Sequence, residues 1–145
     1  MEPHVHHSLN SLLRGEISAI ETYQQALANL ADAESVSELR RIHDEHIAAA
    51  NVLRGRIHEH GGRPDKSSGP WGAFAKAVEG TAKLFGAAAA IEALKEGEHQ
   101  GISDYESAIN DKSLPVDCRR LIQTKLLPQT RAHIPALDLV IARQA

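Results

Sequence analysis

Residues 14–27 and 96–109 share a pattern that constrains the fold more than any other feature of this chain. Gly, Glu, Ile, Tyr and Ala recur at matching positions in the two stretches. In each copy a glutamate lies seven residues before a tyrosine, Glu16 before Tyr23 and Glu98 before Tyr105. Seven residues make about two turns of an α-helix, so the acid and the phenol share one helix face. The repeat therefore predicts two related helices that bring a duplicated carboxylate to a site around an internal two-fold axis.

Apolar residues at alternating spacings of three and four extend these two helices and predict two more. We expect helices over 8–30, from about 35 to 60, over 87–109, and from Pro115 onward. Ser35 and Glu38 have the spacing of a capping box, which would start the second helix. The fourth helix contains Pro128 and Pro135, which predict kinks or a break in it.

A long crossover, residues 61–86, separates the first helix pair from the second. Its first part is rich in Gly, Pro and Ser and predicts a loop, and 71–85 reads as a short amphipathic helix. This helix holds Trp71 and both phenylalanines, so we expect it to cap the core. Two short hairpins joined by one long connection predict an all-α four-helix bundle. We expect residues 1–145 to form one domain, with 1–7 flexible.

Composition agrees with packed helices and narrows the classes of partner. Aromatic residues make up only 3% of the chain, whereas β-sheets favour aromatic and β-branched residues. The net charge is -3 and the basic residues are scattered, which argues against nucleic acid as a partner. No stretch approaches the roughly 20 apolar residues of a membrane span, and no signal peptide is recognisable at the start. We therefore expect no membrane partner, a cytoplasmic location, and a homodimer, if one forms, through the outer helix faces.

The second and fourth helices carry a fainter repeat, in which a leucine precedes a histidine by seven residues. Each hairpin then contributes one glutamate and one histidine from its apolar face. These residues are Glu16, His46, Glu98 and His133. If the hairpins pack about a two-fold axis, two carboxylates and two imidazoles could converge at mid-bundle. Such a set is chemically competent to bind Fe(II), Mn(II) or Zn(II).

On these residues and this order of elements, nearly the whole chain resembles the ferritin-like superfamily, and within it the small two-hairpin family DUF2383. Di-iron members of the superfamily use a glutamate on each of two helices and a Glu-x-x-His motif on each of the other two. The chain matches the two single glutamates and both motif histidines. At the positions of the motif glutamates it has His43 and Thr130 instead. Asp44 and Glu45 are near in sequence, but their helical phase predicts that they point away from the core.

The resemblance implies a single metal ion held by Glu16, His46, Glu98 and His133, with His43 as a further candidate ligand. Tyr23 and Tyr105 would then donate hydrogen bonds to the ligands. Such a protein would act in stress or metal handling, and any activity would be metal-dependent redox chemistry. The residues also allow a second interpretation, in which Glu, His and Tyr satisfy one another in a metal-free polar layer. The protein would then be a structural or interaction module, and the sequence alone leaves both interpretations open.

Overall fold

The regular elements of this protein are all helical in the part that the computed structural model describes, residues 3–69 and 72–144. They are α1 (Pro3–Leu27), α2 (Ala33–Glu59), α3 (Gly72–Phe85), α4 (Ala87–Ile109), α5 (Val116–Leu121), the π-helical turn η2 (Ile122–Leu126) and α6 (Leu127–Arg143). The predicted all-α class is confirmed for these residues. None of the described helices has the length and apolar character that crossing a bilayer requires.

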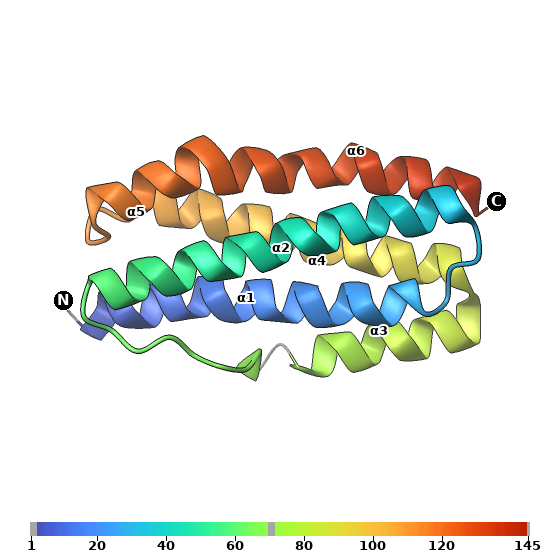
Figure 1. Ribbon diagram of the computed structural model, residues 1–145, viewed down its shortest axis with the longest axis horizontal. Coiled ribbons are helices and arrows are strands. Elements are labelled where there is room, and N and C mark those ends of the chain that lie inside the picture. Colours follow the sequence, from blue (N-terminus) through green and yellow to red (C-terminus); the bar gives the residue numbers. More distant parts are fainter. Residues whose placement is uncertain (1–2, 70–71, 145) are drawn as a thin grey trace.

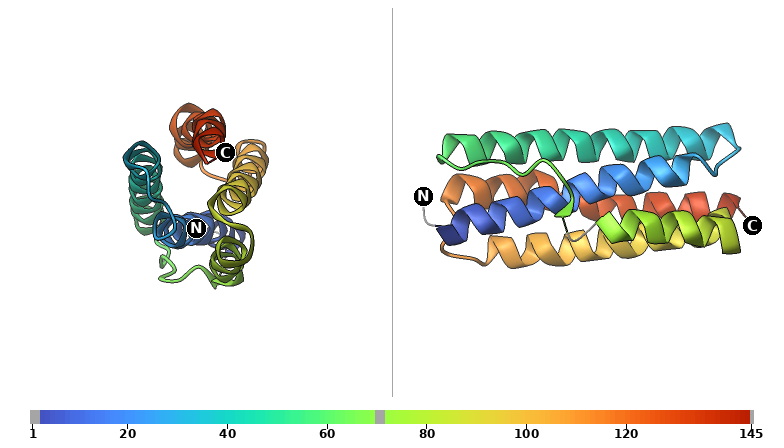
Figure 2. Two further views of the ribbon diagram at one scale, coloured as in Figure 1. Left: turned by 90° about the vertical axis from the view of Figure 1, so that its right-hand side faces the viewer. Right: turned by 90° about the horizontal axis from the view of Figure 1, so that it is seen from below.

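Four long helical stretches lie side by side along the molecule, namely α1, α2, α4 and the α5–η2–α6 stretch (Figure 1). Seen end-on they occupy the four corners of the bundle (Figure 2). Helix α1 packs against α2 and α4, and α6 packs against the same two helices from the opposite side. Helix α3 lies outside this arrangement, against α1 and α4. The short connections thus join antiparallel neighbours, and the long crossover leads from α2 to α4.

The core consists of two apolar clusters, one toward each end of the bundle. Leu13, Leu53 and Ile122 belong to the first cluster, and Leu39 and Leu94 to the second. Along each long helix, a buried polar residue stands near the place where the part that enters one cluster gives way to the part that enters the other. These polar residues are Glu16, His46, Glu98 and His133. Placing ionisable groups between two dry clusters is costly unless they pair with one another.

Both helices of the first hairpin begin earlier than the sequence predicted. Helix α1 starts at Pro3, and Val5 is buried against the first cluster. Residues 3–7 thus belong to this helix, because the apolar spacing continues back to Val5, while the flexibility of 1–7 stays a prediction. Helix α2 has Asp32 as its N-cap, whose carboxylate accepts a hydrogen bond from the backbone N–H of Ser35 at 3.0 Å. An aspartate is as good an N-cap as serine, so the predicted capping box is wrong by three residues.

The crossover contains the predicted helix, which runs without interruption through Gly80 to Phe85. Val78 and Ala82 are its buried contacts with the second cluster. Phe85, in contrast, is 74% exposed, so the prediction that both phenylalanines cap the core is wrong for this one. Trp71 and the side chain of Phe74 lie outside the described residues.

The fourth long helix is interrupted where the prolines predicted. The backbone N–H of Leu127 bonds to the carbonyl of Ile122, five residues back, which makes the turn η2. Pro128 follows at once, and it has no N–H and crowds the carbonyl four residues before it. A wider turn at this place relieves that crowding, and it rotates the side chains of α6 about the helix axis relative to those of α5. Pro135 lies inside α6, which continues to Arg143.

Candidate functional site

The two glutamates and two histidines of the repeats meet halfway along the bundle. The exposed fractions are 5% for Glu16, 5% for His46, 3% for Glu98 and 2% for His133. One comes from each long helix, because all four occupy apolar-face positions. With Tyr23 and Tyr105 they form what we call the central cluster.

The tyrosines of the two repeats are paired crosswise. The hydroxyl of Tyr23 donates to Oε1 of Glu98 at 2.7 Å, and the hydroxyl of Tyr105 donates to Oε1 of Glu16 at 2.5 Å. Each tyrosine therefore binds the glutamate of the other repeat, and the two equivalent bonds agree with the two-fold relation that the repeat predicted. Burial, followed by the charge of Glu98, raises the pKa of Tyr23 well above its usual value. The same holds for Tyr105 beside Glu16, so both phenols stay protonated as donors.

The imidazole of His46 bridges the two glutamates. Its Nδ1 lies 2.5 Å from Oε2 of Glu16, and its Nε2 lies 2.6 Å from Oε1 of Glu98. Burial alone lowers the pKa of His46, but the charges of the two carboxylates outweigh it and raise that pKa well above its usual value. Without a metal ion, His46 is therefore a buried imidazolium that donates to a carboxylate on each side.

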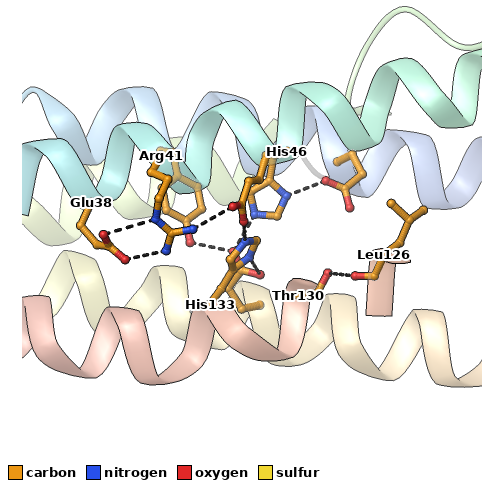
Figure 3. A network of polar contacts seen from close by, with 10 residues as sticks. Glu38, Arg41, His46, Leu126, Thr130 and His133 are labelled. Atoms are coloured by element: carbon orange, nitrogen blue, oxygen red, sulfur yellow. Dashed lines mark hydrogen bonds and ion pairs between the residues drawn. The ribbon is translucent and has the colours of Figure 1, made fainter. Parts of the chain in front are cut away.

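His133 binds Glu98 through one ring nitrogen and a more exposed carboxylate, that of Glu45, through the other. Its Nδ1 lies 3.0 Å from Oε2 of Glu98, and its Nε2 lies 2.7 Å from Oε1 of Glu45. Glu45 in turn accepts a hydrogen bond from Arg41 at 2.8 Å, and Arg41 pairs with Glu38 (Figure 3). The prediction that Glu45 points away from the core is wrong. Position 45 lies at the edge of the buried face of α2, where the side chain is 27% exposed and reaches His133 on α6.

Glu98 is the centre of the group. It accepts hydrogen bonds from Tyr23, His46 and His133. Burial would raise the pKa of its carboxyl, but the charge of His46 and the hydrogen bonds from both imidazoles hold that pKa well below its usual range. Glu98, His46 and His133 each offer a ligand atom, and these atoms lie within 4.8 Å of one another. Glu16 is outside this set of three, although it binds His46.

Two residues at the positions of the ferritin-like motif glutamates do not join the central cluster. His43 has its Nδ1 3.2 Å from Oδ1 of Asp44, while its Nε2 is buried without a hydrogen-bond partner among the described residues. The hydroxyl of Thr130 donates to the carbonyl of Leu126 in its own helix at 2.7 Å (Figure 3). Neither side chain therefore supplies the second pair of carboxylates that a two-metal centre needs.

A second group of ligand-type side chains, which we call the end cluster, lies where α2 ends and α5 begins. His60, Asp117 and Cys118 bring one ligand atom each within 4.8 Å of one another. The Nε2 of His60 lies 3.1 Å from both carboxylate oxygens of Asp117. Sequence reasoning did not find this group, because its members come from two helices with no repeat to relate them.

The described part of the chain defines a class of all-helical bundle proteins with a buried Glu/His/Tyr group at mid-length. The family described as "Domain of unknown function (DUF2383)" matches residues 4–111, and the chain belongs to this family. The match includes Glu16, His46 and Glu98 and ends before α5, so His133 and the end cluster residues on α5 lie outside it. No curated protein and no solved structure matches the chain.

Proposed function

We propose that this protein is a ferritin-like four-helix-bundle protein that binds one divalent transition-metal ion at the central cluster and acts in metal handling or stress. One observation carries the proposal. Each of the two buried imidazoles directs one nitrogen toward Glu98 and the other toward a second carboxylate, Glu16 for His46 and Glu45 for His133. Histidine ligands in metal sites are characteristically oriented in this way by a carboxylate on the far ring nitrogen.

The donor set fits such an ion. His46 Nε2, His133 Nδ1 and the carboxylate of Glu98 would hold it, while Glu16 and Glu45 would fix the tautomers of the two rings. Two imidazoles and one carboxylate suit Fe(II), Mn(II) and Zn(II), which bind nitrogen and oxygen ligands. Once bound, such an ion would act as a Lewis acid, and iron or manganese would add redox chemistry. Relative to the sequence-based prediction of four ligands with His43 as a further candidate, Glu16 becomes an orienting group and His43 is left out.

A second candidate function is a metal-free structural bundle, and a specific observation favours it as well. The nitrogen and oxygen atoms of the central cluster that face one another are already paired in hydrogen bonds. The charges of His46 and Arg41 offset part of the negative charge of the carboxylates that they bind, namely Glu16, Glu98, Glu38 and Glu45. A hydrogen-bonded network of this kind satisfies its buried groups without an ion.

Metal analysis of untagged protein separates the two candidates. The protein would be incubated anaerobically with Fe(II), and separately with Mn(II) and Zn(II), desalted, and assayed for bound metal. We expect one ion per chain, close to none in Glu98→Gln, and an affinity about 10 to 100-fold weaker in Glu16→Gln, where only an orienting group is lost. His43→Gln is the matched control, since it changes a half-buried histidine of the same helix outside the proposed ligand set.

The results of this experiment separate metal binding from a metal-free structural role. Wild-type protein that stays metal-free with all three ions would remove the metal proposal and leave the structural one. Equal metal loss in His43→Gln and Glu98→Gln would mean that binding occurs elsewhere, or that folding and not coordination was damaged. Circular dichroism of each variant tells these last two causes apart.

A further inference from the structure

A cavity of about 50 Å³ lies between α1 and α4, directly beside the central cluster. Its inner wall includes buried Glu16, His46 and Glu98. Its outer wall includes Gln100, which is exposed, and Asp104, which is half-buried. The cavity thus extends from the buried ionisable groups to the surface of the bundle.

The volume limits what this cavity can hold. One water molecule needs about 10–15 Å³ of such space, so the cavity accommodates roughly three waters or a hydrated ion that has lost part of its shell. It is far too small for an organic cofactor.

The cavity exists because both repeats place small residues on the faces where α1 and α4 meet. Gly15 precedes Glu16, Gly97 precedes Glu98, and Gly101 follows one turn later, and all three line the space. A Cβ added at Gly15 would meet no atom within 4 Å, and one added at Gly101 would meet only Thr130 Cγ2 at 3.6 Å. Larger side chains at these two lining positions would therefore fit without colliding with the backbone.

The lining carries three carboxylates against one imidazole. Asp104 stands at the outer part, and Glu16 and Glu98 stand at the inner part beside His46, whereas no lysine or arginine appears among the described lining residues. The excess of carboxylates attracts cations and disfavours anions, because low-dielectric walls focus the field of the charges.

We propose that this cavity is the route by which a divalent cation reaches and leaves Glu98, with Asp104 as the carboxylate that attracts it at the mouth. The inference rests on the proposed metal binding and adds a defined path through the α1/α4 face. A residue on a path changes the rates of uptake and release together, while a ligand changes the equilibrium.

The first test fills the path. Co(II) uptake by wild-type and Gly15→Leu protein would be followed by stopped-flow absorbance, and release by transfer to a chelator. We expect uptake and release both to slow about tenfold in Gly15→Leu, more in Gly15→Phe, with the dissociation constant changed less than twofold. Gly55→Leu is the matched control, because Gly55 is also a helical glycine with open space around it but lies outside the cavity. Leucine is the better helix former at both positions, so the two variants should fold.

The second test removes the charge at the mouth. Asp104→Asn should slow Co(II) uptake several-fold at low salt, and this difference should shrink as salt screens the charge. Glu96→Gln, which removes an exposed carboxylate of the same helix outside the cavity, should leave uptake unchanged.

Normal uptake in Gly15→Leu, with wild-type affinity, would overturn the route while leaving metal binding in place. Loss of affinity without slower release would likewise overturn it, since the substitution would then act on the site itself. A wild-type protein that takes up no Co(II) at all would overturn both the route and the proposed function.

Discussion

The central cluster and the end cluster contain similar side chains at similar spacing, yet they are built differently. Each brings three ligand-type atoms within 4.8 Å of one another. In the central cluster every imidazole nitrogen faces a carboxylate, and all the groups are buried. In the end cluster the side chain of Asp117 is 43% exposed and lies 3.6 Å from the guanidinium of Arg56.

The charges of the end cluster are balanced differently. Burial, followed by the charge of Asp117, raises the pKa of the Cys118 thiol to about 11, so the metal-free protein has a neutral thiol there. Arg56 already supplies the positive charge that Asp117 faces. The comparison teaches that proximity of ligand atoms is a weak criterion for a metal site. What distinguishes the central cluster is a second partner that orients each ligand.

The largest predicted effect on stability follows from removing the carboxylate of Glu98. Glu98→Ala leaves two imidazoles and a phenol without their shared acceptor in a buried site, which should lower the free energy of unfolding by about 3–5 kcal/mol. Chemical denaturation of the metal-free protein measures this. A loss below about 1 kcal/mol would show that the buried network is not a stabilising unit.

Metal binding should stabilise the folded protein through the central cluster and not through the end cluster. At a free ion concentration 100 times the dissociation constant, binding adds about 2.7 kcal/mol to the stability of the folded protein, and a chelator removes it. Thermal unfolding with and without Zn(II) measures the effect. It should vanish in His133→Asn and persist in His60→Asn, and the reverse result would assign the ion to the end cluster.

The free energy of unfolding of the metal-free protein should fall on both the acid and the alkaline side of a maximum. Glu98 has a lowered pKa, so its contribution is complete above about pH 4.5 and is lost as the pH falls. His46 has a raised pKa, so its contribution is complete below about pH 6.5 and is lost as the pH rises through the folded value.

These two groups therefore place the maximum of the free energy of unfolding between about pH 4.5 and 6.5. On either side it changes by at most about 1.4 kcal/mol per pH unit for each proton. Denaturation across pH 3–9 measures the profile. His46→Gln should remove the alkaline arm, whereas His60→Gln should not, and an unchanged profile in His46→Gln would contradict the assignment.

The smallest predicted effect belongs to the end cluster. Asp117→Asn weakens a partly exposed interaction with His60 and Arg56, which is worth about 0–1 kcal/mol and is screened by salt. Denaturation at low and high ionic strength should show the difference between variant and wild type disappear with salt. A salt-independent loss above 2 kcal/mol would mean that this cluster resembles the central one more than its exposure indicates.

The sequence was informative wherever one helix face decided the outcome. Alternating spacings of three and four placed Glu16, His46, Glu98 and His133 on apolar faces, and all four are buried together. The spacing rule assumes that each helix buries only one narrow line of residues. Each long helix touches two long neighbours, so residues at the edge of its buried face also make contacts, and Glu45 reaches His133 from the edge of α2. The Arg41–Glu45 pair at i,i+4 was visible, but it is equally common on solvated faces.

Other differences have similarly local causes. Pro128 predicted an interruption, but not that it would take the form of a wide turn, because the form depends on how α6 must be phased to bring His133 against Glu98. Phe85 was expected in the core as part of an amphipathic helix. It ends α3 and is 74% exposed, whereas Val78 and Ala82 earlier in the same helix are buried.

The crosswise pairing of tyrosines and glutamates makes the two hairpins mutually dependent. The first hairpin by itself would carry Glu16 without its phenol, and the second would carry Glu98 in the same condition. Each half is therefore a poor independent module, and unfolding should be all-or-none along the chain. Two identical hairpins with this motif could satisfy both acids by pairing with each other. The repeat thus places, within one polypeptide, the kind of contacts that a symmetric dimer of hairpins would make.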